Sequence, residues 1–128
     1  MATVHLDSRE TNFAQDIRAG AHQLVADEPP SVGGQGAGFA PYELLLAALV
    51  ACTSATLRMY AERKGWQLGP VHIDCVFGKH GDEEKIERTI VLAPSVPAEQ
   101  RTRLAEIAEK TPVTKTIKRG TPIVTTFA

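Results

Sequence analysis

Cysteine and aromatic residues are scarce in this sequence, and charge is nearly balanced. The 128 residues include two cysteines, and aromatic side chains make up 5% of the chain. Two cysteines cannot form a disulfide framework, and the separation of Cys52 from Cys75 fits no zinc-binding spacing. The formal net charge is −1, with acidic and basic residues interspersed, which gives no basic surface for nucleic acid or a membrane. We therefore expect reduced thiols and neither a metal ion nor another cofactor.

The length and the start of the chain set its organisation and location. A chain of 128 residues is large enough for one hydrophobic core and too small for two, so we expect a single domain over 1–128. No charged segment followed by an apolar stretch opens the sequence. Reduced thiols are usual inside cells, so we expect a cytoplasmic protein.

The stretch 41–64 dominates the sequence. Its residues from Leu44 to Cys52 are all apolar, a run too dense for a surface helix and shorter than the ~18 residues of a membrane span. Pro41 suits a first helical turn, and Gly65 supplies a stop. A helix of this length would be roughly 36 Å long, whereas the radius of gyration of a compact chain of this size is only about 14 Å. Such a helix should cross the whole subunit, and its apolar half should be covered on nearly every side.

Short β segments before this helix predict an antiparallel meander, with strands at 3–6, 12–18 and 21–26. A loop rich in glycine and proline follows at 27–40. Its glycines have neither the Lys-Ser/Thr pair nor the GxGxxG spacing of a phosphate-binding loop. We interpret it as a loop that approaches another backbone closely and leads the chain into the helix.

The second half of the chain changes from alternating to helical periodicity. Apolar residues alternate with mostly polar ones in the two arms of a predicted hairpin. We expect strands at 71–77 and 85–92, a helix at 98–110 with Ser95 as a candidate N-cap, a short helix from Thr111-Pro112 to about 118, and a last strand at 122–127. Strands and helices do not alternate as in βαβ units, so the fold class is α+β.

The two thiols differ in their sequence surroundings. Cys75 lies on the apolar face of a predicted strand, where a cysteine is a small buried hydrophobe. Cys52 lies too far from the first helical turn for the helix dipole to activate it, so activation would need a cation from elsewhere in the structure. Periodicity alone favours a structural role for Cys52. However, Thr53, Ser54 and Thr56 end the apolar run there, so the rest of the helix meets something polar.

Two segments resemble one known family. The segment 22–66 reads HQLVADEPPSVGGQGAGFAPYELLLAALVACTSATLRMYAERKGW, and the segment 104–117 reads LAEIAEKTPVTKTI. The spacing of DEP, GG, PYELLLAAL and CT in the first, and the TPV stretch in the second, resemble the OsmC/Ohr-like family, in particular an OsmC-like branch that lacks the second signature cysteine. With the order of the strands, the resemblance covers nearly the whole chain.

The resemblance implies an intertwined homodimer of α+β subunits, with antiparallel sheets around long central helices. A partner subunit would cover the apolar half of the helix. Characterised members are thiol-dependent peroxidases with sites at the subunit interface. The implied partners are therefore a hydrophobic small-molecule hydroperoxide and a small thiol or dithiol reductant, with no nucleic acid and no membrane.

The chain departs from the family pattern at three positions. The resolving cysteine of the Cys-Pro-Val signature is replaced by Thr111, which could keep an N-cap hydrogen bond. The acid that follows the family's proline is replaced by Tyr42, with Glu43 next. The family's arginine on the N-terminal strands corresponds to Arg9 or Arg18, and both assignments stay open. We place Tyr42 and Thr111 beside the substrate.

Two hypotheses from different classes follow. In the first, the protein is a one-cysteine thiol peroxidase: Cys52 is the nucleophile, Arg18 or Arg9 stabilises its thiolate, and Glu43 orients that arginine. Glu43 in a first helical turn is equally explained as a capping residue. In the second, the protein is a non-catalytic dimeric binding or scaffold protein that keeps the fold and has lost turnover. A cysteine hydrolase or transferase ranks last because no base is evident.

Overall fold

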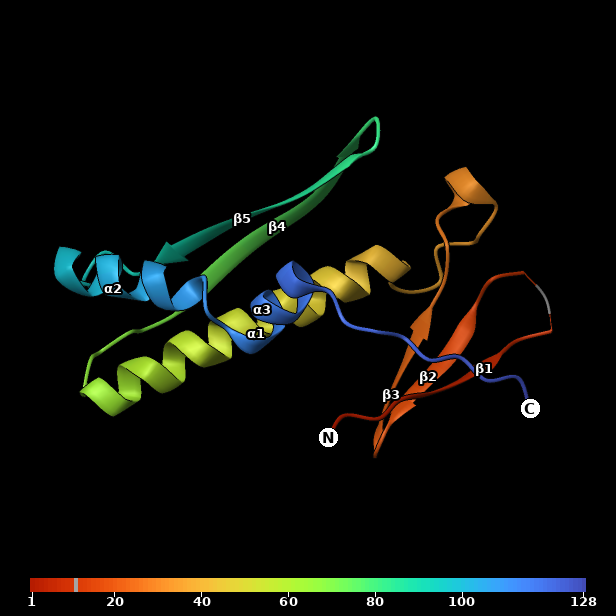
Figure 1. Cartoon of the computed structure of the whole chain (residues 1–128), viewed down its shortest axis with the longest axis horizontal. Coiled ribbons are helices and arrows are strands. Elements are labelled where there is room, and N and C mark those ends of the chain that lie inside the picture. The colour runs from red at the N-terminus through yellow and green to blue at the C-terminus, as the bar shows by residue number, and fades with distance from the viewer. Residues whose placement is uncertain (11) are drawn as a thin grey trace. The chain divides into compact units, whose positions relative to one another are not determined.

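A computed structural model describes residues 1–10 and 12–128. Figure 1 shows its elements, which in chain order are β1 (His5–Ser8), β2 (Gln15–Ala19), β3 (His22–Ala26), the 3-10 turn η1 (Pro30–Val32), α1 (Pro41–Lys64), β4 (Val71–His80), β5 (Glu83–Leu92), α2 (Ala98–Ala108) and α3 (Pro112–Arg119). The chain divides into two compact units, Met1–Leu45 and Leu46–Ala128. The fold is α+β, as the sequence predicts.

The first unit contains the predicted meander. Its strands form an antiparallel sheet in the order β1-β2-β3. Leu6 pairs with Ile17, which pairs with Leu24, so these three side chains share one face of the sheet. The first two strands lie a few residues later in the chain than predicted, because alternation locates a strand more reliably than it locates its ends.

The loop after β3 is organised by a buried carboxylate. The side chain of Asp27 accepts hydrogen bonds from the backbone N–H groups of Glu28 at 2.7 Å, Ala37 at 3.0 Å and Gln35 at 3.2 Å. These donors, Ala37 foremost, hold the pKa of Asp27 below its ordinary value against the opposing effect of burial. One side chain therefore closes a loop of about a dozen residues.

Two glycines in this loop confirm that it approaches other backbone closely. A Cβ atom added at Gly34 would lie 1.8 Å from the carbonyl oxygen of Glu28, and one added at Gly38 would lie 1.9 Å from that of Val25. Neither position has room for a side chain. The loop glycines thus serve backbone packing, as the sequence indicates.

Helix α1 has the predicted bounds. However, the expectation that its apolar half is covered on nearly every side is wrong within a single chain. One stripe is buried, made of Leu49, Thr53, Leu57 and Ala61 at intervals of four residues. Other positions in the apolar half are not covered: Ala48 is exposed, and Leu45 retains 37% of its surface. Cover on nearly every side would require a second molecule.

Length and composition alone would let α1 cross a membrane. Its most apolar 18-residue window has a mean hydropathy of 1.6. One such helix is weak evidence, because the central helix of a soluble protein passes the same test.

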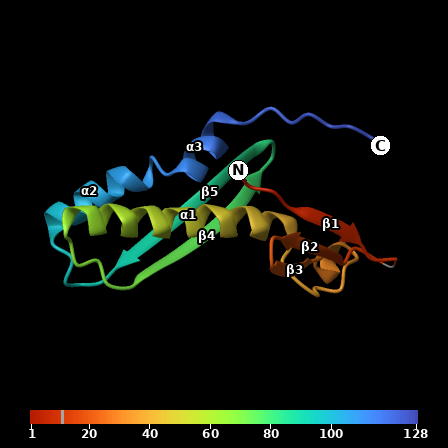
Figure 2. The same cartoon turned by 90° about the horizontal axis from the view of Figure 1, so that it is seen from below.

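In the second unit, a long hairpin and two helices pack on α1. Strands β4 and β5 pair over ten residues each, from Val71 opposite Leu92 to His80 opposite Glu83. Figures 1 and 2 show the turn of the hairpin projecting away from α1. The predicted alternation is confirmed, since Val71, Ile73, Cys75 and Phe77 are half-buried. The core residues are Leu57, Ala61, Leu68, Val96, Leu104 and Ala108.

Two predictions for the C-terminal third are wrong. Helix α2 has Pro97 at its N-cap and not Ser95, and no side chain caps it. The predicted strand at 122–127 is not formed: the segment after α3 is neither helix nor strand, and Phe127 is 96% exposed. A strand needs a neighbouring edge for its backbone hydrogen bonds, and this segment pairs with none among the described residues.

Candidate functional site

The candidate nucleophile lies midway along α1. Cys52 is half-buried, and its Sγ lies 4.0 Å from Oγ1 of Thr56, one turn further along the helix. The residue is several turns from the N-terminus of α1, where a helix dipole would stabilise a thiolate. Any activation of this thiol has to come from a charged group outside the helix.

A largely buried arginine that sequence reasoning missed hydrogen-bonds Thr53, the residue after Cys52. Arg88 on β5 donates from Nη1 to Oγ1 of Thr53 at 2.8 Å and to Oγ1 of Thr114 at 3.0 Å. Its Nη2 donates to the carbonyl of Ala108 at 3.0 Å, and its side chain is only 11% exposed. Thr53 in turn donates to the carbonyl of Leu49 at 2.7 Å. The guanidinium thus connects α1, α3 and the end of α2.

Thr111 belongs to the same network. Its side chain is completely buried, and its Oγ1 lies 2.6 Å from that of Thr114. It occupies the N-cap position of α3, but its side chain makes no capping bond. The expectation of an N-cap hydrogen bond is therefore wrong, because the Thr111 hydroxyl bonds the side-chain hydroxyl of Thr114 in place of a backbone N–H in the first turn of α3.

The sequence does contain a signal for the burial of Arg88, which is its spacing from apolar residues along β5. Arg88 falls on the same face of β5 as Ile86, Ile90 and Leu92, because all four are separated by multiples of two. An arginine in register with apolar residues indicates buried acceptors. The threonines that accept lie 35 and 26 residues away in the chain, so their proximity depends on tertiary structure.

Cys75 lies opposite Arg88 in the hairpin and is less suited to chemistry than Cys52. The two residues are paired in the β4–β5 ladder. Burial raises the pKa of the Cys75 thiol, and the charge of Arg88 offsets only part of that effect. Cys75 is therefore even less ionised at neutral pH than an ordinary cysteine.

The two arginines named from the sequence each have a carboxylate partner within the first unit. Arg9 forms an ion pair with Asp16 at 3.0 Å, and Arg18 forms one with Asp7 at 2.9 Å. Arg18 lies on strand β2, whereas Arg9 lies in the turn between β1 and β2. All four side chains are substantially exposed, so each pair adds little to stability.

The first turn of α1 holds the other two predicted site residues. Glu43 accepts a hydrogen bond from the backbone N–H of Ala40 at 2.8 Å, which is the reciprocal half of a capping box. This contact matches the capping explanation. Tyr42 is exposed.

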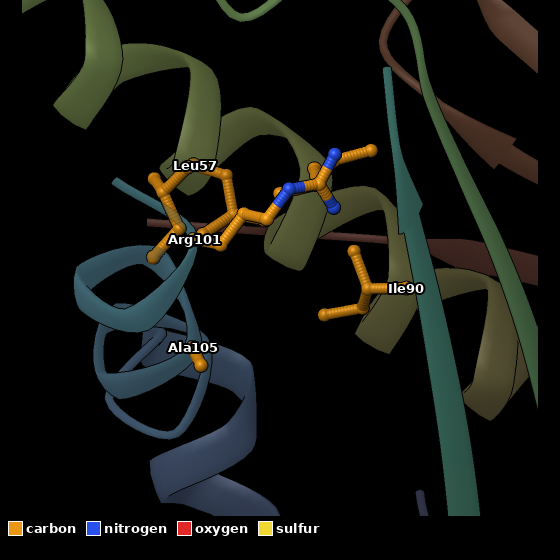
Figure 3. A pocket seen from close by; sticks show the side chains of 6 residues that line it. Leu57, Ile90, Arg101 and Ala105 are labelled. Carbon is orange, nitrogen blue, oxygen red and sulfur yellow. The ribbon is translucent and has the colours of Figure 1, made fainter. Parts of the chain in front are cut away.

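A small apolar pocket lies elsewhere in the second unit. It has a volume of about 170 Å³ and is lined by Leu57, Ile90, Leu92, Arg101, Leu104 and Ala105, as Figure 3 shows. The guanidinium of Arg101 donates to the carbonyls of Ala93 at 2.6 Å and Val96 at 2.9 Å. The lining of this pocket includes none of the residues that Arg88 hydrogen-bonds.

Comparison with known proteins gives a single fold. The model of the OsmC-like protein family matches residues 34–126. An osmotic stress induced and detoxification response protein, as it is described, from Psychrobacter arcticus 273-4 superposes with a TM-score of 0.79 at 16% identity, over 91% of this chain and 88% of that one. The organic hydroperoxide resistance protein OsmC of Legionella pneumophila gives 0.68 at 17%, over 92% and 89%.

A third structure, OhrB of Bacillus subtilis, an organic hydroperoxide resistance protein, gives a TM-score of 0.63 at 20% identity, over 92% of this chain and 90% of that one. The comparison with curated proteins gives no match. Together, the antiparallel sheets and the long helix define a class of α+β proteins. Within that class, the chain belongs to the OsmC-like family.

Proposed function

We propose that this protein protects against organic hydroperoxides by reducing them with the Cys52 thiol, and that a small external thiol completes the cycle. The observation that carries the proposal is the contrast between the two cysteines. Cys52 lies half-buried in the family's helical signature, and the residue after it, Thr53, accepts a hydrogen bond from the largely buried Arg88, whereas burial raises the pKa of Cys75. Two of the structural neighbours are named for organic hydroperoxide resistance, which agrees with this chemistry.

The proposed reaction balances with one hydroperoxide and two thiols. The Cys52 thiolate attacks the terminal peroxide oxygen and the O–O bond breaks, so that Cys52 becomes a sulfenic acid. The departing alkoxide takes up the proton that the thiol lost on ionisation and is released as an alcohol. An external thiol attacks that sulfur and releases water, giving a mixed disulfide. A second external thiol then releases Cys52 and carries away the disulfide.

The remaining residues of the proposed site have supporting roles. We assign thiolate stabilisation to Arg18, because it lies on a strand, with Arg9 as the alternative; Glu43 would orient the arginine. Each of these side chains has another partner in this structure, so each would have to exchange that partner for the reaction. Tyr42 and Thr111 are proposed to border the substrate, Thr111 from its buried position in the Arg88 network.

The partners of the proposed reaction are a second copy of the chain, a hydrophobic hydroperoxide and the reductant. The exposed apolar residues of α1 support the homodimer. A cytoplasmic location agrees with two reduced thiols.

A peroxide-consumption assay tests the function. The protein is supplied with cumene hydroperoxide and a monothiol, and hydroperoxide loss is measured for wild type, Cys52→Ser and the matched control Cys75→Ser. We expect wild type and Cys75→Ser to turn over at similar rates and Cys52→Ser to fall to the rate without protein. Equal rates for Cys52→Ser and wild type would overturn the proposal. No turnover by any of the three would favour the non-catalytic binding or scaffold protein.

A further inference from the structure

The Arg88 network joins three elements at one point. Thr53 follows Cys52 directly on α1, Thr114 lies in the first turn of α3, and Ala108 ends α2. One nitrogen, Nη1, bonds both threonine hydroxyls, so these two oxygens are close to each other. Thr111 then bonds Thr114. A continuous path of hydrogen bonds therefore leads from the residue after Cys52 to position 111.

Among the described residues, the hydrogen-bond acceptors of Arg88 include no carboxylate. Its ion-pair partner is Glu109, whose Oε1 lies 3.8 Å from Nη2, beyond hydrogen-bond distance, and Glu109 is also paired with Lys118 at 2.6 Å. The acceptors of Arg88 are instead hydroxyl and carbonyl oxygens, one of them at the C-terminal end of α2, where the helix dipole favours a cation. Burying a guanidinium costs free energy, and an apolar residue often stabilises such a site better. The fork geometry of arginine does offer something an apolar residue lacks, which is fixed alignment of several acceptors.

We propose that Arg88 is a positioning residue: it holds the first turn of α3 against α1 beside Cys52 and so keeps position 111 within disulfide reach of the Cys52 thiol. The inference rests on the proposed function in taking Cys52 as the reacting thiol. It also implies that this chain retains the geometry for a second thiol although Thr111 has replaced that thiol. A disulfide requires Cα atoms about 4.4–6.8 Å apart, so a shift of α3 by a few ångströms would prevent it.

The test measures this geometry without peroxide. In a Thr111→Cys, Cys75→Ser background, the bond between Cys52 and the introduced thiol is equilibrated with reduced and oxidised glutathione, quenched, and quantified by mass spectrometry. The result is an effective concentration of one thiol at the other. Arg88→Met, Arg88→Lys and Thr114→Val are then added singly, and Arg58→Met serves as the matched control. Arg58 lies on α1, as Cys52 does, and donates to the backbone carbonyl of Gly69 at 2.6 Å. However, it is exposed and lies outside the Arg88 network.

We expect Arg88→Met to lower the effective concentration at least about tenfold, because hydrogen bonds to a charged group are lost. The value for Arg88→Lys should fall between those of Arg88→Met and the background, since lysine keeps the charge but lacks the planar guanidinium that bonds several acceptors. Thr114→Val should resemble Arg88→Met, and Arg58→Met should match the background. If Arg88→Met does not fold by circular dichroism, Thr114→Val and Arg88→Lys decide.

Three results would overturn the inference: no disulfide in the background, values within about twofold for every Arg88 and Thr114 variant that folds, or an equal loss in Arg58→Met. None of them depends on hydroperoxide. Failure of wild type to consume peroxide would instead count against the proposed function alone.

Discussion

At the scale of single residues, one arginine bonds the residue after one cysteine and pairs with the other. Arg88 hydrogen-bonds Thr53, next to Cys52, and it is the cross-strand partner of Cys75. For Cys75, burial outweighs this neighbouring charge and raises the pKa of the thiol. A charge near a thiol therefore does not by itself make the thiol reactive, because desolvation opposes it.

Cys52 should be the thiol that an organic hydroperoxide oxidises first. The thiolate is the reacting form, and burial leaves Cys75 with less of it. Protein treated with one equivalent of cumene hydroperoxide and dimedone should carry the adduct at Cys52 by peptide mass spectrometry. Unfolding in guanidinium before treatment should make the two sites similar. Preferential labelling of Cys75 in the folded protein would be incompatible with the proposed site.

Thr111→Cys should convert the protein from a one-cysteine to a two-cysteine peroxidase. The introduced thiol can condense with the Cys52 sulfenic acid, release water and form a disulfide that a dithiol reduces. Wild type should need a small thiol for turnover, and the variant should cycle with a dithiol. The lost hydroxyl bond to Thr114 should cost roughly 1 kcal/mol of stability. If the variant folds, forms no bond under peroxide and consumes none, Cys52 is not the peroxide-reactive thiol.

At the scale of elements, the loop between β3 and α1 depends on backbone contacts. Gly38→Ala should destabilise the protein, because the added Cβ would lie 1.9 Å from the carbonyl oxygen of Val25. Forced overpacking of this kind costs about 1–3 kcal/mol, which thermal or urea unfolding will measure. Gly78→Ala is the control: its Cβ meets nothing within 4 Å, so stability should change far less. Equal effects would contradict the close approach.

The same loop should respond to acid through Asp27. Its pKa is held below the ordinary 3.8, so the folded form binds protons less readily than the unfolded chain. The stabilisation is complete above that ordinary value and is lost as pH falls below it toward the folded pKa. The amide resonances of Gln35 and Ala37 should therefore keep their shifts at higher pH and move only in that acid range. Asp27→Asn should remove this titration, and a titration that persists in Asp27→Asn would assign it to another group.

The elements could largely be predicted from sequence, and the failures share a cause. Pro41 and Gly65 bracket α1 so clearly that both of its ends are predicted correctly, because those residues act locally. Three features depend instead on which groups lie nearby in the folded structure. They are the partner of the Thr111 hydroxyl, the burial of Arg88, and the lack of a strand partner for segment 122–127 among the described residues. Periodicity gives the face on which a residue lies, but it does not identify the group that the residue meets.

At the scale of the whole molecule, the described chain leaves apolar surface on several elements of its second unit. Met59 on α1 is 51% exposed, Val76 and Val91 on the hairpin are 61% and 52% exposed, and Phe127 in the C-terminal segment is 96% exposed. That segment is rich in β-branched residues and has no strand partner among the described residues. Surface of this kind is typical of an interface between subunits.

We therefore expect an obligate homodimer. Such interfaces bury at least ~2,000 Å² in total, so the protein should sediment as a monodisperse dimer at micromolar concentration. Met59→Arg should weaken it, because a charge would enter an apolar contact without a partner. Thr102→Arg adds the same charge to an exposed position of α2 and should leave the dimer intact. The decisive result is the wild-type sedimentation coefficient: a monodisperse monomer at micromolar concentration would leave the apolar face of α1 without the cover that we assign to it.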